Sequence, residues 1–86
     1  MRVLAIIPAY NEAGSVGDGV RAIRRERPGT DVAVVDDGSR DATAVEARNA
    51  GAVVLQLPFN LGIGGAVQTG YKYAWDNGYD IAIQVD

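Results

Sequence analysis

The chain has 86 residues, a formal net charge of −3, and no cysteine or histidine. Its length and its hydrophobic content of 48% indicate one small globular domain, residues 1–86. The absence of a basic stripe argues against a nucleic-acid partner. Without cysteine the chain cannot form disulfides or bind zinc through thiolates, and without histidine it has no histidine-bound zinc and no histidine-based triad.

The first predicted strand covers residues 2–7, an apolar run too short for a signal peptide or a membrane span, which favours a cytoplasmic location. Proline cannot donate to a β-ladder, so Pro8 is expected to end this strand. Ser15 is the predicted N-cap of a helix that runs to about residue 27, with Asp18 completing a weak capping box. The apolar face of this helix repeats at helical spacing through Val16, Val20 and Ile23.

The second predicted strand, residues 31–35, is a valine-rich run typical of a strand buried on both faces. Asp36 and Asp37 are expected just past its end, because a buried strand does not tolerate unpaired acids. Ser39 or Asp41 is expected to cap a helix over residues 42–50, with Gly51 just after its C-terminus. Ala42, Val45 and Asn49 are expected on one face of this helix.

The third predicted strand covers residues 52–57 and is followed by Pro58 and a glycine-rich turn, residues 60–65. A third helix is expected to run to about residue 77, where Gly78 ends it. Its predicted buried residues are Ala66, Val67, Gly70, Tyr71 and Ala74. Residues 80–85 form the fourth predicted strand, which Asp86 follows.

The elements alternate as βαβαβαβ, which predicts a Rossmann-like α/β fold with a parallel sheet and right-handed crossovers. The expected strand order is 3-2-1-4, so the order reverses between strands 1 and 4. Residues 8–12 and Asp86 are expected to line the crevice at this switch point. The fourth strand leaves an exposed apolar edge, residues 81–85, so we expect either the amino-terminal part of a larger domain or a homodimer paired through this edge.

Acidic side chains follow the predicted strands and are expected to converge on one crevice. They are Glu12, Asp36, Asp37 and Asp86. Carboxylates suit Mg²⁺ or Mn²⁺, which substrate phosphates often share, and Tyr10 offers a ring on which a base can stack. The alternative is that Asp36, Asp37 and Ser39 form only a turn and a helix cap. No G-x-G-x-x-G follows the first strand and no P-loop motif is present, which disfavours dinucleotide and P-loop chemistry.

Four motifs occur in order along the chain. They are Pro8-Ala9-Tyr10-Asn11-Glu12, Val35-Asp36-Asp37-Gly38-Ser39 with Asp41 and Thr43, Asn60-x-Gly62-x-Gly64-Gly65-Ala66 leading to Gly70, and Gln84-Val85-Asp86. Together they resemble the family 2 glycosyltransferases, in particular the branch of dolichyl-phosphate mannose synthases and bacterial polyprenyl-phosphate sugar transferases. The resemblance covers the whole chain and implies the amino-terminal half of a GT-A fold. It also implies transfer of a sugar from a UDP- or GDP-sugar donor with Mg²⁺ or Mn²⁺.

The resemblance implies roles for individual residues. The nucleotide pocket is lined by Pro8, Ala9, Tyr10 and Glu12, and Asp37 contacts the base while Asp36 holds the turn. Gly65 lets the backbone approach the donor. Asp86 is the first aspartate of the Asp-x-Asp metal motif. Structural alternatives remain: Pro8 ends a strand, Tyr10 covers the sheet rim, and the glycines pack a helix on the sheet. The second aspartate and the general base are expected beyond residue 86, so the chain alone is not expected to turn over.

The polyprenyl-phosphate branch further implies a lipid phosphate acceptor, inversion at the sugar carbon, and a full-length protein associated with the cytoplasmic face of a membrane. An alternative function is that of a non-catalytic nucleotide-binding or dimerising α/β module. A third interpretation, a nucleotidyltransferase, is disfavoured because the loop after the first strand lacks an Arg/Lys-rich triphosphate site.

Overall fold

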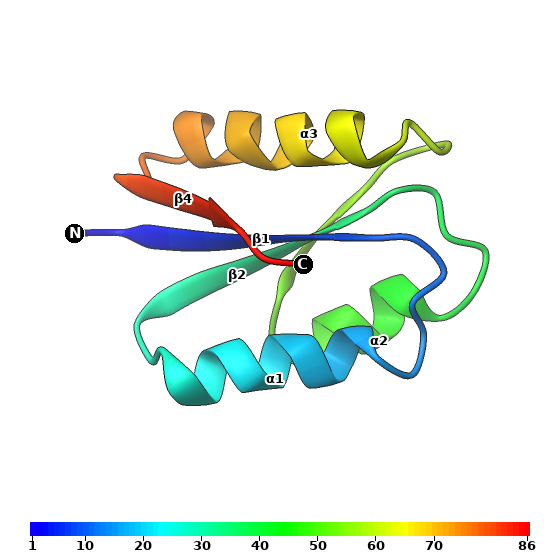
Figure 1. The fold of residues 1–86 in the computed structure, drawn as a ribbon, viewed down its shortest axis with the longest axis horizontal. Helices are drawn as coiled ribbons and strands as arrows, with labels where there is room; N and C mark the ends of the chain where they lie inside the picture. The colour runs from blue at the N-terminus through cyan, green and yellow to red at the C-terminus, as the bar shows by residue number, and fades with distance from the viewer.

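The computed structural model describes all 86 residues as a four-stranded sheet with three helices. In chain order the elements are β1 (Val3–Ala9), α1 (Val16–Glu26), β2 (Thr30–Asp36), α2 (Thr43–Asn49), β3 (Val53–Gln56), α3 (Ile63–Asp76) and β4 (Ile81–Gln84) (Figure 1). All strands are parallel and lie in the order β3-β2-β1-β4, which confirms the predicted Rossmann-like topology. None of the helices combines the length and the apolar character needed to cross a membrane.

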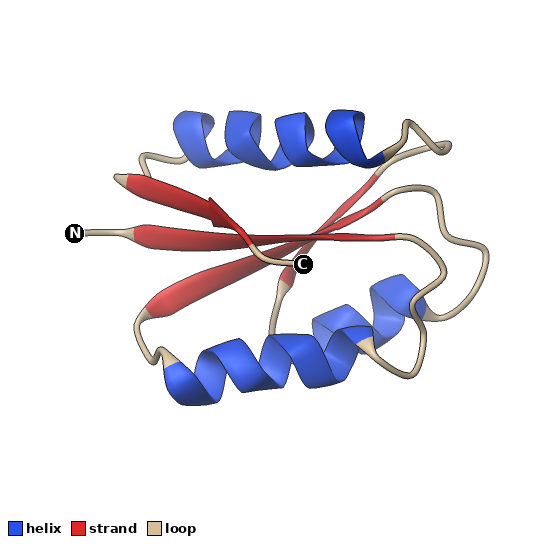
Figure 2. Cartoon of the chain, viewed as in Figure 1, coloured by secondary structure: helices blue, strands red, loops and turns tan.

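The sheet lies between two helical layers, with α3 on one face and α1 and α2 on the other (Figure 2). Side chains of a strand alternate between the two faces, and the core is accordingly divided in two. Leu4, Ile6, Ala33 and Val35 pack with Ala66 and Ala74 of α3, whereas Val32 and Val34 pack with Val16, Val20 and Ala47 of α1 and α2. Residues 32–35 are all buried, so the valine-rich run is covered on both faces as predicted.

The first strand does not end at Pro8, contrary to the prediction, but continues to Ala9. The carbonyl of Ile6 accepts the N–H of Val85, and the carbonyl of Ala9 accepts the N–H of Asp37. Successive residues of a strand point their polar groups to opposite neighbours, so the nitrogen of Pro8 faces the β4 side. The ladder with β4 has already ended at Ile6, so Pro8 removes no bond from the β1–β2 ladder.

The predicted N-cap position is correct at α1 and wrong at α2, and the predicted C-terminal glycines are correct. Ser15 precedes α1 without a side-chain cap bond, and its hydroxyl instead donates to the carbonyl of Glu12 at 3.2 Å. Ala42 precedes α2, where neither Ser39 nor Asp41 occupies the N-cap position. Gly51 follows α2 with a φ of 104°, a left-handed conformation that glycine adopts without strain.

The structure shows which faces of α2 and α3 are buried. The buried residues of α2 are Thr43, Ala44 and Ala47, whereas Val45 is exposed. Thr43 fixes this rotation because its hydroxyl accepts a hydrogen bond from the neighbouring β1–α1 loop. On α3 the residues Ala66, Gly70 and Ala74 are buried as predicted, but Val67 is only half-buried and Tyr71 is exposed.

The fourth strand forms one edge of the sheet, as predicted, and pairs only with β1. Its residues lie opposite Val3 to Ile6 of β1, so β4 is shorter than the predicted span of residues 80–85. Ile81 and Ile83 are exposed on this strand. Asp86 follows β4 near the carboxyl end of β1, which places it at the rim where parallel strands present their loops.

Candidate functional site

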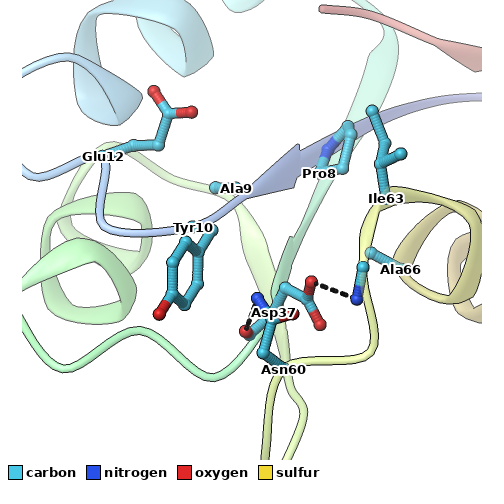
Figure 3. A pocket seen from close by; sticks show the side chains of 9 residues that line it. Pro8, Ala9, Tyr10, Glu12, Asp37, Asn60, Ile63 and Ala66 are labelled. Carbon is cyan, nitrogen blue, oxygen red and sulfur yellow. Dashed lines mark hydrogen bonds between the residues drawn. The ribbon is translucent and has the colours of Figure 1, made fainter.

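A cavity of about 280 Å³ opens at the carboxyl ends of β1 and β2, against the start of α3. Its lining residues are Pro8, Ala9, Tyr10, Glu12, Asp37, Asn60, Gly62, Ile63 and Ala66 (Figure 3). The carboxyl edge of a parallel sheet is where open α/β folds bind ligands. The structure therefore brings together five of the residues that the sequence proposed for a nucleotide pocket.

Asp37 is a buried carboxylate at the floor of this cavity. One of its oxygens accepts the backbone N–H of Leu61 at 2.7 Å, and the other accepts the N–H of Gly62 at 2.9 Å. The side chain of Asn60 donates to the backbone carbonyl of Asp37 at 3.3 Å. Asp37 thus ties the end of β2 to the glycine-rich turn before α3. A carboxylate has about four lone-pair positions, so acceptor capacity remains for a ligand in the cavity.

Asp36 has a different role from its neighbour. It is the last residue of β2, buried, and its carboxylate accepts the backbone N–H of Ser39 at 3.0 Å, which closes a local turn. This is the turn that the sequence offered as the alternative to a ligand contact. Asp36 lines a separate polar cavity of about 350 Å³ beside Tyr10, not the cavity that contains Asp37.

Gly65 and Asp86 do not reach the cavity that contains Asp37. Gly65 lies in the first turn of α3, where an added Cβ would come within 2.8 Å of the Cβ of Leu61, and Gly62 lines the cavity in its place. Asp86 borders a second cavity of about 250 Å³, between α1 and the end of β4, and accepts a hydrogen bond from the side chain of Gln84 at 2.9 Å. Pro8, Ala9 and Glu12 line both cavities, so the two adjoin at the end of β1.

The expected convergence of four acids is wrong. No group of three or more acidic side chains lies close enough to hold a metal ion. The carboxylates of Asp36 and Asp37 each accept backbone N–H groups, and in Figure 3 the carboxylate of Glu12 points away from that of Asp37. Asp86 offers one oxygen ligand, so a divalent cation held there would need phosphate oxygens and water to complete its coordination.

Sequence reasoning missed how the β1–α1 loop is held. The backbone N–H of Glu12 donates to the hydroxyl of Thr43 at 2.8 Å, and that of Ala13 donates to the carboxylate of Asp41 at 3.2 Å. Hydrogen bonds from Thr43, chiefly from its hydroxyl, lower the pKa of Asp41 below its ordinary value. The alternating polar residues Ser39, Asp41 and Thr43 were the available signal for such a set of acceptors.

Comparison with known proteins places this geometry in a family. The sequence profile described as "Glycosyl transferase family 2" matches residues 4–79. The chain belongs to this family. The fold is accordingly the Rossmann-like core of the GT-A glycosyltransferases, and the resemblance inferred from the four motifs is confirmed.

Two similar proteins have names that refer to phosphates linked to polyprenols. The chain is 38% identical over its whole length to an undecaprenyl-phosphate mannosyltransferase of Micrococcus luteus, of which the match covers 37%. It is 30% identical to a polyprenol monophosphomannose synthase of Mycolicibacterium smegmatis, with 99% of this chain and 34% of that protein matched. The chain therefore spans about a third of the length of these relatives.

A solved structure with the same fold is glucosyl-3-phosphoglycerate synthase of Mycobacterium tuberculosis, crystallised with Mg²⁺ and UDP. It superposes with a TM-score of 0.74 at 25% identity, over 99% of this chain and 33% of that one. The same enzyme has also been solved with Mn²⁺ and UDP-glucose. Nucleotide sugars and divalent cations are thus ligands of a protein that shares this fold.

Proposed function

We propose that this chain forms the nucleotide-binding part of an enzyme that transfers a sugar from a nucleoside-diphosphate donor to a polyprenyl phosphate. The observation that carries the proposal is the cavity at the carboxyl ends of β1 and β2, which combines an exposed aromatic ring, Tyr10, with a buried carboxylate, Asp37. The family membership supports the reaction class, and the names of the two polyprenyl-phosphate relatives support the acceptor.

The size and lining of the cavity fit a nucleoside. Its volume of about 280 Å³ lies just below the range of roughly 300–1,000 Å³ that small-molecule sites occupy. We assign the base and ribose to this cavity, and the rest of the nucleotide sugar to the space beyond it. The base would stack on Tyr10 and donate to the free lone pairs of Asp37, and Glu12 at the rim would accept from a ribose hydroxyl.

The diphosphate would extend from this cavity toward the second one, because Pro8, Ala9 and Glu12 border both. Asp86 would then supply one oxygen to a Mg²⁺ or Mn²⁺ ion shared with the phosphates. Such an ion neutralises the charge that develops on the leaving nucleoside diphosphate. We assign no general base within residues 1–86, so the catalytic half of the reaction is not proposed for this chain.

A polyprenyl phosphate acceptor implies that the enzyme acts at a membrane. Its phosphate lies at a membrane surface and its chain lies in the lipid, so the enzyme would act on the cytoplasmic face of a membrane. The support for this step is the pair of relatives with polyprenyl-phosphate names, which match 99% or more of this chain.

Calorimetric titration of UDP and GDP into the folded chain, with and without Mn²⁺, tests the nucleotide site. We expect one nucleotide to bind and Mn²⁺ to strengthen it, with the gain from Mn²⁺ lost in Asp86→Asn. Loss of base stacking costs roughly 1–3 kcal/mol, so Tyr10→Ala should weaken binding by about fivefold to a hundredfold. Tyr71→Ala removes an equally exposed ring from α3, outside both cavities, and should leave binding unchanged.

Absence of binding by both nucleotides, in a chain that circular dichroism shows to be folded, would overturn the proposal that these residues form a nucleotide site. Equal weakening by Tyr10→Ala and Tyr71→Ala would overturn the role given to Tyr10.

A further inference from the structure

The loop that carries Tyr10 and Glu12 is held in place by side chains from a different part of the chain. Four consecutive backbone N–H groups of this loop, those of residues 11–14, each donate to a side-chain oxygen. The pairs are Asn11 with Ser39 at 2.8 Å, Glu12 with Thr43 at 2.8 Å, Ala13 with Asp41 at 3.2 Å, and Gly14 with Glu46 at 2.9 Å. The acceptors all belong to the segment between β2 and the first turn of α2, residues 39–46.

This dependence on side chains has a physical cause. Asn11 adopts a φ of 50°, the left-handed conformation that non-glycine residues adopt at a cost, so the loop needs outside contacts to keep its shape. The side chain of Asn11 also accepts the backbone N–H of Arg40 at 3.0 Å, which adds a bond in the reverse direction. The loop conformation that places Tyr10 and Glu12 at the cavity is therefore set by residues 39–46.

Thr43 is the central member of this set. It is fully buried, at the first position of α2, and its hydroxyl accepts from Glu12 while donating to Asp41. The second carboxylate oxygen of Asp41 accepts from Ala13. Removal of the Thr43 hydroxyl would leave the N–H of Glu12 without its acceptor and Asp41 without its nearest donor. The bond between Glu12 and Thr43 is partly buried, so the freed N–H would have to turn toward solvent to find another acceptor, and the loop would rearrange.

We propose that Thr43, acting with Asp41, is a positioning residue for the nucleoside diphosphate, an inference that rests on the nucleotide site proposed above. Thr43 lines neither of the two cavities at the end of β1, so it acts through the loop and not by touching the ligand. Its contribution is preorganisation: the loop already has the shape that binds, and no binding free energy is spent on ordering it.

The test compares nucleotide affinity in three variants of the 86-residue chain by calorimetry. Thr43→Val keeps the shape of the side chain but removes the hydroxyl, and we expect about a tenfold loss of affinity for the nucleotide that the unmodified chain binds. Thr43→Ser restores the hydroxyl and should recover most of this loss. Thr30→Val makes the same substitution at the start of β2, the opposite end of the sheet, and should change nothing. A thermal melt of each variant separates affinity from stability.

Ser39→Ala is a milder second variant, which removes only the acceptor of the Asn11 N–H and should weaken binding a few-fold. It keeps the inference testable if Thr43→Val does not fold. Undiminished affinity in folded Thr43→Val, or in Ser39→Ala, would overturn the positioning role while leaving the nucleotide site intact. No nucleotide binding by the unmodified chain would instead overturn the proposed function, and this inference with it.

Discussion

Gly38 lies against the backbone of the turn that precedes α3. Its φ is 79°, and a Cβ added there would lie 2.8 Å from the backbone nitrogen of Asn60 and from the carbonyl carbon of Phe59. We expect Gly38→Ala to push residues 59–60 away from Asp37 and to lower the free energy of unfolding by about 1–3 kcal/mol. Urea unfolding measures the stability, and nucleotide titration measures the accompanying loss of affinity.

Gly29→Ala is the matched control for this prediction. Gly29 has a similar φ of 99°, but no atom lies within 4 Å of the added Cβ. It should therefore show only the conformational penalty of about 1–2 kcal/mol, with nucleotide affinity unchanged. If both variants lose the same stability and neither loses affinity, the close contact at Gly38 has no bearing on the cavity.

At the residue scale the sequence predicted which side chains reach the sheet rim but not what they contact there. Asp36 and Asp37 are adjacent in sequence and chemically identical, yet one closes a local turn and the other accepts N–H groups of residues 61 and 62. The second pairing joins positions 24 and 25 residues apart, which no local pattern encodes. The bonds from Thr43 and Asp41 to the first loop were missed for the same reason.

Gly70 determines how closely α3 approaches the sheet. A Cβ added at this position would come within 2.5 Å of the Cγ2 atom of Ile6, a fully buried side chain of β1. Alanine favours a helix over glycine by up to about 1 kcal/mol, but overpacking a core costs typically about 1–3 kcal/mol. The second effect is larger, so Gly70→Ala should destabilise the fold, as a lowered urea midpoint would show.

Gly19, the fourth residue of α1, provides the comparison because nothing lies within 4 Å of its added Cβ. Gly19→Ala should raise the free energy of unfolding by about 0.5–1 kcal/mol. A stabilised Gly70→Ala variant would mean that α3 shifts at no cost and that the close approach is not needed.

At the element scale the sequence predicted every strand and helix and the strand order, because alternating strands and helices leave few topologies for a parallel sheet. It was wrong where the position of a neighbouring element mattered more than a local pattern. Pro8 was expected to end β1 and does not, because its nitrogen faces the side where β4 has stopped. The face that was expected to combine Ala42, Val45 and Asn49 is exposed, because α2 packs through Thr43, Ala44 and Ala47.

On the scale of the whole molecule, both edges of the sheet have unpaired backbone groups. β3 and β4 each pair on one side only, which leaves a row of backbone groups able to pair with another strand. Each edge also exposes a large apolar side chain, Val53 on β3 and Ile83 on β4. Ile81 adds a second exposed apolar residue to β4. We therefore expect β4 to pair with another strand more readily than β3 does.

We therefore expect the 86-residue chain to form a homodimer by pairing its β4 strands, with a mass by light scattering that rises with concentration. Ile83→Lys should restore a monomer, because a charge on an edge strand opposes pairing. Val53→Lys places the same charge on the β3 edge and should leave the dimer intact. A monomer at every concentration would show that the β4 edge does not pair with itself, and equal dissociation by both variants would show that charge acts through general repulsion and not at β4. Pairing through β4 would place the second copy close to the cavity bordered by Val85 and Asp86, because that cavity lies directly beyond this strand.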